Sequence, residues 1–591
     1  MRVFPSRRSI ALSVVLLTTA CGAQQTYFGQ NLVRYDDFEF RILQTEHFDI
    51  YYYPEERAAV EQAGRMAERW YARLTRLLNH ELRGRQPIIY YASHPHFQQT
   101  LTLGRAPGEG VGGATEVFKR RIVLPFAGPL VETDHVLGHE LVHAFQFDMT
   151  QGEGALTQRN IPRALGLPLW FIEGMAEYLS VGSADPHTAM WIRDAVVNDR
   201  LPTMRQLNDP RFFPYRFGQA FWAYVAGRFG DPVVGRILNA AARGGSAEAA
   251  IEAVLRIPID SLNAEWHQEV RTAYAGVREV TEDVDRYGRS VLTRDNSGIL
   301  NSSPALSPNG DRIVFISERD RTSIDLFLAP TDSGTAAVKL VEMATDPHLA
   351  SLQFIYSAGS WAADGRRFVF AGITQSDPLI AVVDVESGTR TFERTFRELG
   401  EILNPTWAPD GNAVAFTALV GGFTDLYVYD MDADSLHRLT NDPYAELHPS
   451  WSPDGSQIAF VTDRFSTDLD RLRYGEFRLG LIDPGTGVVS AAPGFGTGKQ
   501  LNPQWGPDSR EIFFLSDRNG ITNVYRVDLT TGELYQVTNL YGGVTGITAL
   551  SPALSTAFSE RQVAFSYYQK GGYNIVVMDD AKLLDGIPVP R

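Results

Sequence analysis

The strongest chemical signal in this chain is the five-residue segment His139-Glu140-Leu141-Val142-His143. Histidines at positions i and i+4 lie one helical turn apart on one face, so both imidazoles can bind the same zinc ion. The glutamate between them is placed to remove a proton from a zinc-activated water. The alternative interpretation is an exposed helix that carries two incidental histidines.

Zinc in a catalytic site needs a third protein ligand, and residues 169–178 offer one. A carboxylate in an otherwise apolar helix is costly unless it is paired or bound to metal, which makes Glu173 the candidate ligand. Glu177 lies one turn further and could accept a hydrogen bond from a ligating imidazole. The alternative for Glu177 is a solvated helix residue.

Together, His-Glu-x-x-His and the later Trp-x-x-Glu-Gly-x-Ala-Glu resemble the gluzincin metallopeptidases, the class of thermolysin and the zinc aminopeptidases. The resemblance implies a zincin-like α+β catalytic domain. It also implies that His139, His143 and Glu173 bind one Zn²⁺ and that Glu140 is the general base. The expected substrate is a peptide or protein.

Two further positions match this family less closely. Residues 214–218, Pro-Tyr-Arg-Phe-Gly, resemble a segment of zinc aminopeptidases whose tyrosine stabilises the oxyanion, which implies that role for Tyr215. Its aromatic neighbours leave a packing role open. Residues 113–117 resemble the strand by which aminopeptidases hold a free amine, which implies a substrate-binding role for Glu116. An ordinary edge-strand residue is the alternative, so exopeptidase and endopeptidase activity both stay open.

The residue pattern from 31 to 280 predicts an α+β domain that positions these side chains. Alternating or β-rich stretches predict strands at 48–53, 87–92 and 116–125. Apolar spacing predicts helices at 55–82, 133–147 and 168–179, with Thr133 or Asp134 capping the second. The His-Glu-x-x-His segment would lie on that second helix.

The remainder of the chain, from about 285 to 591, is a repeat. A signature of the type Trp-x-Pro-Asp-Gly starts at 306, 361, 407, 451, 505 and 550 in more or less complete form. Proline fixes φ and glycine allows a positive φ, so the signature forms a tight turn between strands. Four strands for each repeat predict an all-β propeller with six blades.

The ends of the repeat region suggest how the ring closes. Little chain remains for an outer strand of the last blade, whereas residues 289–293 look like a spare strand before the first. We expect that strand to complete the sixth blade, although a plain linker is the alternative. The repeats resemble the propellers of the Tol-associated periplasmic protein, which is informative about fold and weak for function.

Composition limits the partners of the protein. It has 54 Lys and Arg against 70 Asp and Glu, a net charge of −16, which argues against nucleic acid as a partner. A single cysteine excludes an intrachain disulfide and any multi-cysteine metal site.

The first 23 residues read as an export signal, with Arg2, Arg7 and Arg8 before a short apolar run. Residues 18–21, Thr-Thr-Ala-Cys, resemble a bacterial lipobox, which implies lipidation of Cys21; cleavage after Ala23 is the alternative. No segment reaches the roughly 20 apolar residues of a membrane span, so a lipid would be the membrane anchor. We expect an exported protein, periplasmic or anchored to the outer membrane.

These features predict an exported zinc metallopeptidase whose propeller binds or gates substrate or partner. One alternative is an envelope-binding scaffold that uses the propeller to bind an envelope protein partner and carries an inactive protease domain. Another is a metal-dependent hydrolase that acts on a non-peptide bond.

Overall fold

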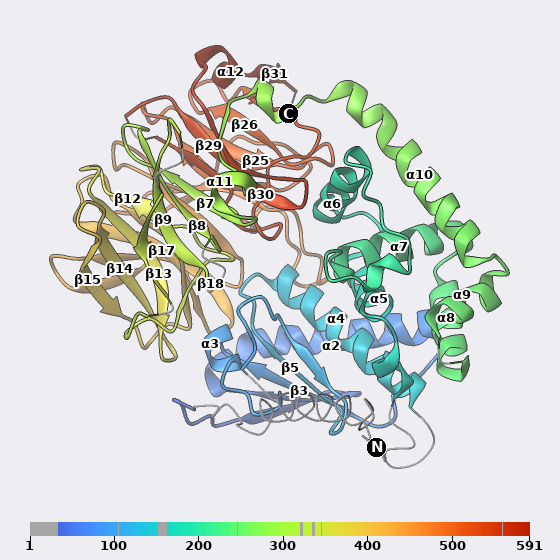
Figure 1. Ribbon diagram of the computed structural model, residues 1–591. Coiled ribbons are helices and arrows are strands. Elements are labelled where there is room, and N and C mark those ends of the chain that lie inside the picture. Colours follow the sequence, from blue (N-terminus) through green and yellow to red (C-terminus); the bar gives the residue numbers. More distant parts are fainter. Residues whose placement is uncertain are drawn as a thin grey trace, which may run out of the picture.

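The computed structural model of the protein describes residues 34–103, 106–151, 162–244, 246–319, 323–333, 337–343, 345–557 and 559–590. The predicted signal sequence and Cys21 lie outside these residues. None of the described helices is both long and apolar enough to span a membrane. The described chain has an α-rich N-terminal region followed by a β-propeller (Figure 1).

One five-stranded sheet lies in the N-terminal region. Its order is β1 (Arg41–Gln44), β2 (Phe48–Tyr52), β3 (Gln86–Tyr91), β5 (Arg121–Pro125) and β4 (Ala114–Glu116). Strands β2, β3 and β5 are parallel, and β4 adds to the edge in the antiparallel sense. The single strand expected over 116–125 is therefore wrong. The chain turns between β4 and β5, where Arg120 adopts a φ of 52°.

Helices pack against this sheet and continue to the propeller. They are α2 (Arg57–Leu78), α4 (Leu130–Thr150), α5 (Leu169–Val181), α6 (Pro186–Val197), α7 (Pro214–Phe229), α8 (Pro232–Gly244), α9 (Ala247–Leu255) and α10 (Ile259–Val280). Buried residues of α2, α4, α5 and α7 form one apolar core with the sheet. The last helix, α10, leads the chain up to the propeller (Figure 1).

The predicted cap of the His-Glu-x-x-His helix is wrong. Helix α4 starts at Leu130, after Pro129, so Thr133 and Asp134 lie inside it. The Thr133 hydroxyl accepts a hydrogen bond from the Ala127 N–H at 3.4 Å. Asp134 instead accepts from the Trp70 indole at 2.9 Å, which ties α4 to α2.

Six sheets form the six predicted blades. Blade 1 contains β7 (Asn301–Leu306), β8 (Arg312–Ser317), β9 (Asp325–Pro330) and β10 (Val338–Val341); blade 2 contains β11 (Ser351–Leu352), β12 (Ser360–Trp361), β13 (Arg367–Thr374), β14 (Asp377–Asp384) and β15 (Thr389–Thr395); blade 3 contains β16 (Glu401–Trp407), β17 (Ala413–Val420), β18 (Phe423–Asp430) and β19 (Ser435–Arg438). Blade 4 contains β20 (Glu446–Trp451), β21 (Ile458–Thr462), β22 (Arg478–Ile482) and β23 (Val489–Ala491); blade 5 contains β24 (Gln500–Trp505), β25 (Glu511–Ser516), β26 (Asn523–Asp528), β27 (Leu534–Gln536) and β31 (Ile587–Val589); blade 6 contains β28 (Leu554–Thr556), β29 (Val563–Gln569), β30 (Gly572–Met578) and β6 (Arg289–Leu292).

The repeat signature has a visible role in this architecture. Gly365 adopts a φ of 65°, and its N–H donates to the carbonyl of Ala362 at 3.0 Å, which closes the tight turn. The indole of Trp361 donates to the carbonyl of Ala305 in the preceding blade at 2.9 Å. The signature therefore forms turns within blades and hydrogen bonds between them.

The ring closes as expected from the spare strand. Strand β6 pairs antiparallel with β30, and Leu292 lies opposite Ile575. The first strand of the propeller thus completes the last blade, and the plain-linker interpretation of 289–292 is wrong. This pairing covers an edge that would otherwise be open.

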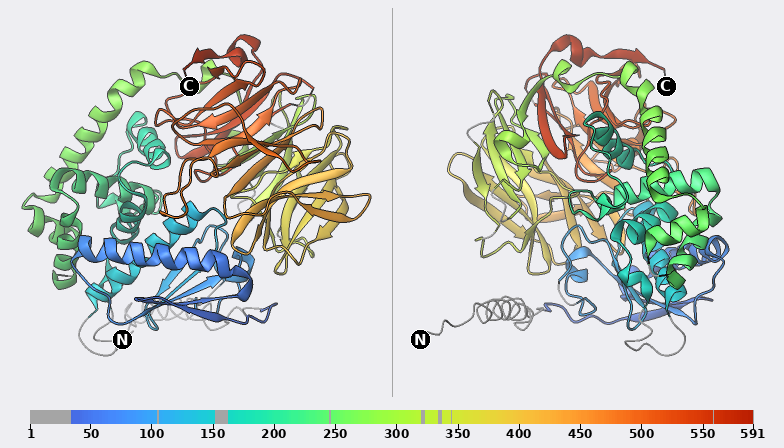
Figure 2. Two further views of the ribbon diagram at one scale, coloured as in Figure 1. Left: turned by 180° about the vertical axis from the view of Figure 1, so that it is seen from behind. Right: turned by 45° about the vertical axis from the view of Figure 1, so that its right-hand side comes forward.

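The propeller is packed against the N-terminal region (Figure 2). Buried Arg193 of α6 donates to the carbonyls of Tyr541 and Gly542 at 2.9 and 3.0 Å. On another side, Arg65 of α2 donates to the carbonyl of Leu469 at 3.2 Å. These contacts come from two different helices, and residues of α4 itself, such as Val131, also pack against the propeller.

Candidate metal centre and its surroundings

Three side chains converge between helices α4 and α5. The Nε2 atoms of His139 and His143 lie 3.1 Å apart. The Oε2 atom of Glu173 lies 3.2 Å from the first and 3.1 Å from the second. Both histidines are more than nine-tenths buried, and Glu173 is half-buried. The structure thus brings together the three predicted zinc ligands.

Close helix packing sets these positions. A Cβ atom at Gly174 would lie 2.3 Å from the Cα of Gly218, so α5 and α7 cross where neither helix has a side chain. The crossing fixes Glu173 on one helix and Tyr215 on the other. A Cβ at Gly138 would lie 2.6 Å from the Trp70 ring, so α4 also needs glycine beside His139.

The charges around the cluster favour a bound cation. Burial by itself would lower the pKa of His143, but the carboxylates of Glu173 and Glu140 outweigh it and raise the pKa to about 9. Burial would raise the pKa of Glu173, yet His143 and His139 hold it well below its usual range. The carboxylates therefore favour positive charge on the neighbouring histidines. A bound divalent cation would supply that positive charge in their place.

The ligand geometry fits zinc. Zn–N distances of about 2.0–2.1 Å in a tetrahedral site put two ligand atoms roughly 3.3 Å apart. The three separations of 3.1–3.2 Å between His139, His143 and Glu173 are close to that value. Two imidazoles and one carboxylate are also a donor set that zinc accepts in catalytic sites.

An acceptor oxygen lies beside the outer ring nitrogen of each predicted ligand histidine. Buried Gln146 accepts from the Nδ1 of His143 at 2.8 Å and donates to the carbonyl of Ile172 at 3.0 Å. The Oε1 of Glu177 lies 3.6 Å from the Nδ1 of His139. Partners of this kind leave Nε2 free to bind metal.

Glu177 belongs to a second group of charged side chains. Its Oε2 lies 3.5 Å from the Nε2 of His135 and 3.9 Å from Arg216. Burial would raise the pKa of Glu177, but His135, His139 and Arg216 lower it to about 2. The interpretation of Glu177 as a solvated residue is wrong, because the side chain is 9% exposed.

The edge strand β4 holds the predicted general base. The Thr115 hydroxyl donates to Oε2 of Glu140 at 2.7 Å. A Cβ at Gly113 would lie 3.0 Å from Cγ and 3.1 Å from Oε1 of the same glutamate. The strand therefore binds one carboxylate oxygen, and at Gly113 it packs so closely on the glutamate that a side chain would not fit between them.

Tyr215 lies in the first turn of α7, with its ring stacked on His139 at a centroid distance of 5.9 Å. Burial, and then the charges of Glu173 and Glu140, raise the pKa of the Tyr215 phenol above its ordinary value. The hydroxyl therefore stays protonated and can donate a hydrogen bond. The structure places Tyr215 at the cluster.

Glu116 is directed elsewhere. Its carboxylate accepts hydrogen bonds from the N–H groups of Phe118 and Lys119 at 2.9–3.2 Å and pairs with Arg121 at 3.2 Å. Successive strand residues face opposite sides, and Thr115 is the one that reaches Glu140. The structure therefore does not bring Glu116 to the predicted amine-binding position.

Three side chains at the cluster were missing from the sequence prediction. His135 precedes His139 by four residues, and Gln146 follows His143 by three, so helical spacing could have found both. Thr115 had no such signal. Its role depends on the turn that separates β4 from β5.

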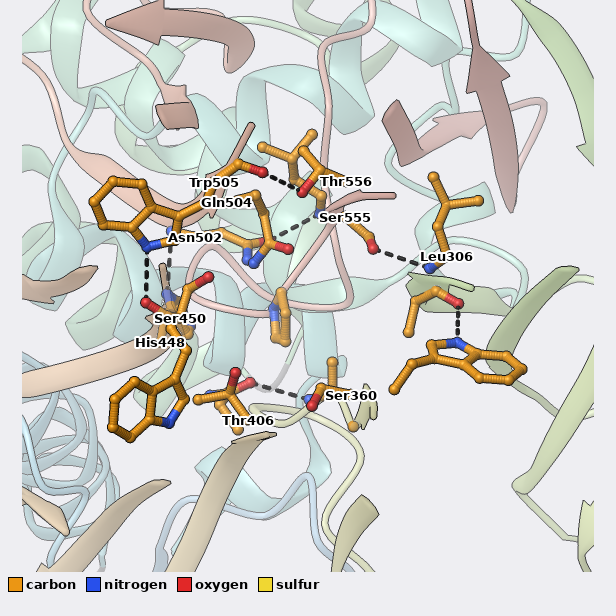
Figure 3. Close-up of a pocket in the computed structure, with 18 of the residues that line it drawn as sticks. Leu306, Ser360, Thr406, His448, Ser450, Asn502, Gln504, Trp505, Ser555 and Thr556 are labelled. Carbon is orange, nitrogen blue, oxygen red and sulfur yellow. Dashed lines mark hydrogen bonds between the residues drawn. The ribbon is translucent and has the colours of Figure 1, made fainter. Parts of the chain in front are cut away.

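Apart from this cluster, a hollow runs along the propeller axis (Figure 3). All six blades line it through their innermost strands, with Ser360, Thr406, Ser450, Gln504 and Thr556 among the polar residues. His448 accepts from the Asn502 N–H at 3.3 Å, and its other ring nitrogen lies 3.0 Å from the Leu550 carbonyl. This histidine therefore joins blades 4, 5 and 6 at the channel wall.

Comparison with known proteins identifies the propeller. The family model "TolB beta propeller domain" matches residues 346–468. An uncharacterised protein of Agrobacterium fabrum is 25% identical over 220 residues, which are 37% of this chain and 70% of that protein. The Tol-Pal system protein TolB of Anaeromyxobacter dehalogenans is 29% identical over 139 residues, 23% of this chain and 28% of its own length.

Peptidases are also among the proteins with a similar fold. The solved structure of Pyrococcus horikoshii acylaminoacyl peptidase is 13% identical, covers 48% of this chain and 46% of its own, and superposes with a TM-score of 0.31. The chain thus combines a TolB-like six-bladed propeller with an α-rich N-terminal region that carries the His139–His143–Glu173 cluster.

Proposed function

We propose that the N-terminal region is a zinc metallopeptidase domain of the gluzincin type with a zincin-like fold. The observation that supports this proposal is the convergence of His139, His143 and Glu173 from two helices within hydrogen-bonding distance of one another. Glu140, on the same helix as the histidines, would be the general base.

Zinc held there would supply a Lewis acid and lower the pKa of a water molecule. Glu140 would take the proton from that water as it attacks the peptide carbonyl, and would then pass the proton to the leaving amine. The hydrogen bond from Thr115 to Oε2 would orient the carboxylate for this transfer. Gln146 and Glu177 would keep the two imidazoles in the ligating tautomer.

Strand β4 would align the substrate. It is the last strand of its sheet, so one side of its backbone can pair with an extended peptide. Gly113 packs directly on the Glu140 side chain, so a peptide paired with β4 would run close to that carboxylate. The Tyr215 phenol would donate to the carbonyl oxygen as negative charge develops.

The propeller would restrict entry to this site and offer a surface to a protein partner in the cell envelope. Its contacts with α2 and α6 hold it over α4, and its axial channel is lined by all six blades. The likeness to a Tol-Pal system protein supports an extracytoplasmic location. The lipobox-like sequence at 18–21 is the ground for a lipid anchor on Cys21.

Metal analysis of the full chain tests the proposal. We expect about one zinc per protein in the wild type and loss of that zinc in His139→Ala. The control is His437→Ala, an exposed histidine of β19 that lies far along the chain from the cluster. Peptide-library cleavage by the wild type completes the test. Equal zinc content in His139→Ala and wild type would overturn the metal site, and zinc without cleavage would overturn the peptidase activity.

A further inference from the structure

A cavity of about 140 Å³ lies between the N-terminal region and the propeller. This volume suits a side chain rather than a single water molecule, which needs about 10–15 Å³ on the same measure. Its walls are largely apolar and come from both parts of the molecule: Phe126, Val136, Ile355, Leu403, Leu447 and Leu550.

The cavity adjoins the proposed catalytic site. Val136 lies on α4 one turn before Glu140, and a Cβ at Gly112 would lie 3.4 Å from the Val136 side chain. The next residue, Gly113, lies against Glu140 itself. A peptide that runs along β4 past Glu140 would therefore bring a neighbouring residue to the cavity.

Three carboxylates line this otherwise apolar space: Glu109, Glu132 and Glu401. Oε1 of Glu109 accepts from the N–H groups of Phe354 and Ile355 at 3.0 and 3.2 Å, whereas its buried Oε2 has no hydrogen-bond partner in the described part of the chain. Oε1 of Glu401 accepts from the N–H of His94 at 2.6 Å.

No described lysine or arginine lines this space, and His135, which interacts electrostatically with Glu132, pairs with Glu177 at 3.5 Å. Among the residues that the structure describes, no lysine, arginine or histidine forms an ion pair with any of the three carboxylates. Burial lowers the pKa of His94 to about 4, so it stays neutral, and Arg216, which faces the cavity residue Tyr356, pairs with Asp185 at 3.2 Å. Burial raises the pKa of Glu109 to about 8 and that of Glu401 to about 7.

We infer that this cavity, bounded by Glu109, Glu132 and Glu401, is a subsite for a positively charged group of a peptide substrate. Buried carboxylates without a cation are unfavourable, and an ammonium or guanidinium would pair with them while an aliphatic stem contacts the apolar walls. The group could be a lysine or arginine side chain or the free α-amine of the peptide. The inference rests on the proposed peptidase function.

Matched peptides separate these possibilities. The zinc-loaded full chain is given pairs of peptides in which one position beside the cleaved bond holds either lysine or its uncharged analogue norleucine. Each peptide is tested with a free and with an acetylated N-terminus. We expect kcat/KM to be at least about 10-fold higher for the charged member, as for one hydrogen-bonded charge. A lysine effect assigns the side chain to the cavity, and an acetylation effect assigns the α-amine.

Variants test whether the cavity causes the preference. Glu109→Gln combined with Glu401→Gln keeps an oxygen for each backbone N–H and removes the negative charge, so the charged-to-neutral ratio of kcat/KM should fall towards 1. Glu533→Gln, an exposed carboxylate beside Tyr535 in blade 5, is the control and should leave that ratio unchanged. Thermal unfolding of each variant shows whether the domain contacts persist.

A binding measurement separates the two proposals. If the wild type cleaves no peptide, the proposed function fails, and fluorescence polarisation then measures binding of the lysine and norleucine peptides to Glu140→Gln. Tighter binding of the charged peptide, lost when Glu109→Gln and Glu401→Gln are added, would still support the subsite. No charge preference in cleavage or binding, or a preference that survives the double substitution, would overturn it.

Discussion

The two parts of this molecule use their residues in different ways. The propeller repeats one turn signature around a ring, so the sequence signal for its fold recurs several times along the chain. The N-terminal cluster is encoded once, because His139 and Glu173 come from two helices, α4 and α5, and each of these packs closely on another helix at a single glycine. We therefore expect a substitution in one copy of the turn signature to affect folding and function less than a substitution in the single cluster.

This difference explains why the comparison with known proteins matches the propeller and not the N-terminal cluster. The family match covers residues 346–468, within the blades, whereas the chemical residues lie before residue 220. Similarity therefore follows the repeated turns, whereas the proposed function depends on a few side chains outside them. Substitutions in each part can test how far this contrast holds.

Glu140→Gln should have the largest effect on function. The amide cannot accept the proton of the attacking water, so we expect kcat to fall by about 10²–10⁴-fold. Zinc content and thermal stability should stay near wild-type values, because Gln keeps the shape and an acceptor for Thr115. Steady-state cleavage and metal analysis on the same preparation measure both. Unchanged kcat would remove Glu140 from the mechanism.

Tyr215→Phe should come next. Loss of one donor to a developing oxyanion lowers kcat by about 10²–10³-fold. The ring stacked on His139 is kept, so zinc affinity and folding should change little. If kcat stays within about twofold of wild type, Tyr215 is a packing residue only.

Gly174→Ala tests the uniqueness of the helix crossing. Its new methyl group would overlap the backbone of Gly218, and we expect a loss of about 2–3 kcal/mol in the free energy of unfolding. Zinc affinity should fall as well, since Glu173 is the adjacent residue. Denaturant unfolding and a zinc titration measure the two effects. A stable variant with normal zinc affinity would contradict the close approach of α5 and α7.

Gln146→Leu removes the hydrogen-bond acceptor of His143 without changing the size of the side chain much. We expect zinc affinity to fall about 10–100-fold, as for other partners that orient a metal ligand. Gln146→Glu, which keeps an acceptor, should recover part of that loss. Competition with a zinc chelator measures the affinities. Equal zinc affinity in Gln146→Leu and the wild type would show that Gln146 has a packing role only.

Gly365→Ala should have the smallest effect. The residue adopts a φ of 65°, which costs a non-glycine residue about 1 kcal/mol, but only Pro308 lies within 4 Å of the added methyl group. Unfolding should shift slightly and cleavage should not change. A larger loss than in Gly174→Ala would reverse the contrast between repeat and unique site.

The propeller could be predicted from the sequence nearly in full, because turn and strand signals recur in each blade and even the closing strand 289–293 carries them. The spacing of His139, His143 and Glu173 likewise predicted residues that the structure brings together. Local pattern could not show that residues 116–125 fold back as a hairpin. The resemblance to an aminopeptidase strand selected Glu116, whereas Thr115 is the residue that reaches the site. Nor could it show Glu109 and Glu401, which share a cavity only after the propeller has docked.

The pairing of β6 with β30 has a consequence for the order of folding. Leu292 cannot pair before Ile575 has been made, so nearly the whole propeller has to be synthesised before the ring can close. Contacts so distant in sequence form late, because the entropy of closing the intervening loop opposes them. The helices that carry His139, His143 and Glu173 precede that loop and can assemble first. The newly made chain would thus pass through a stage in which this cluster has formed and the propeller does not yet cover it.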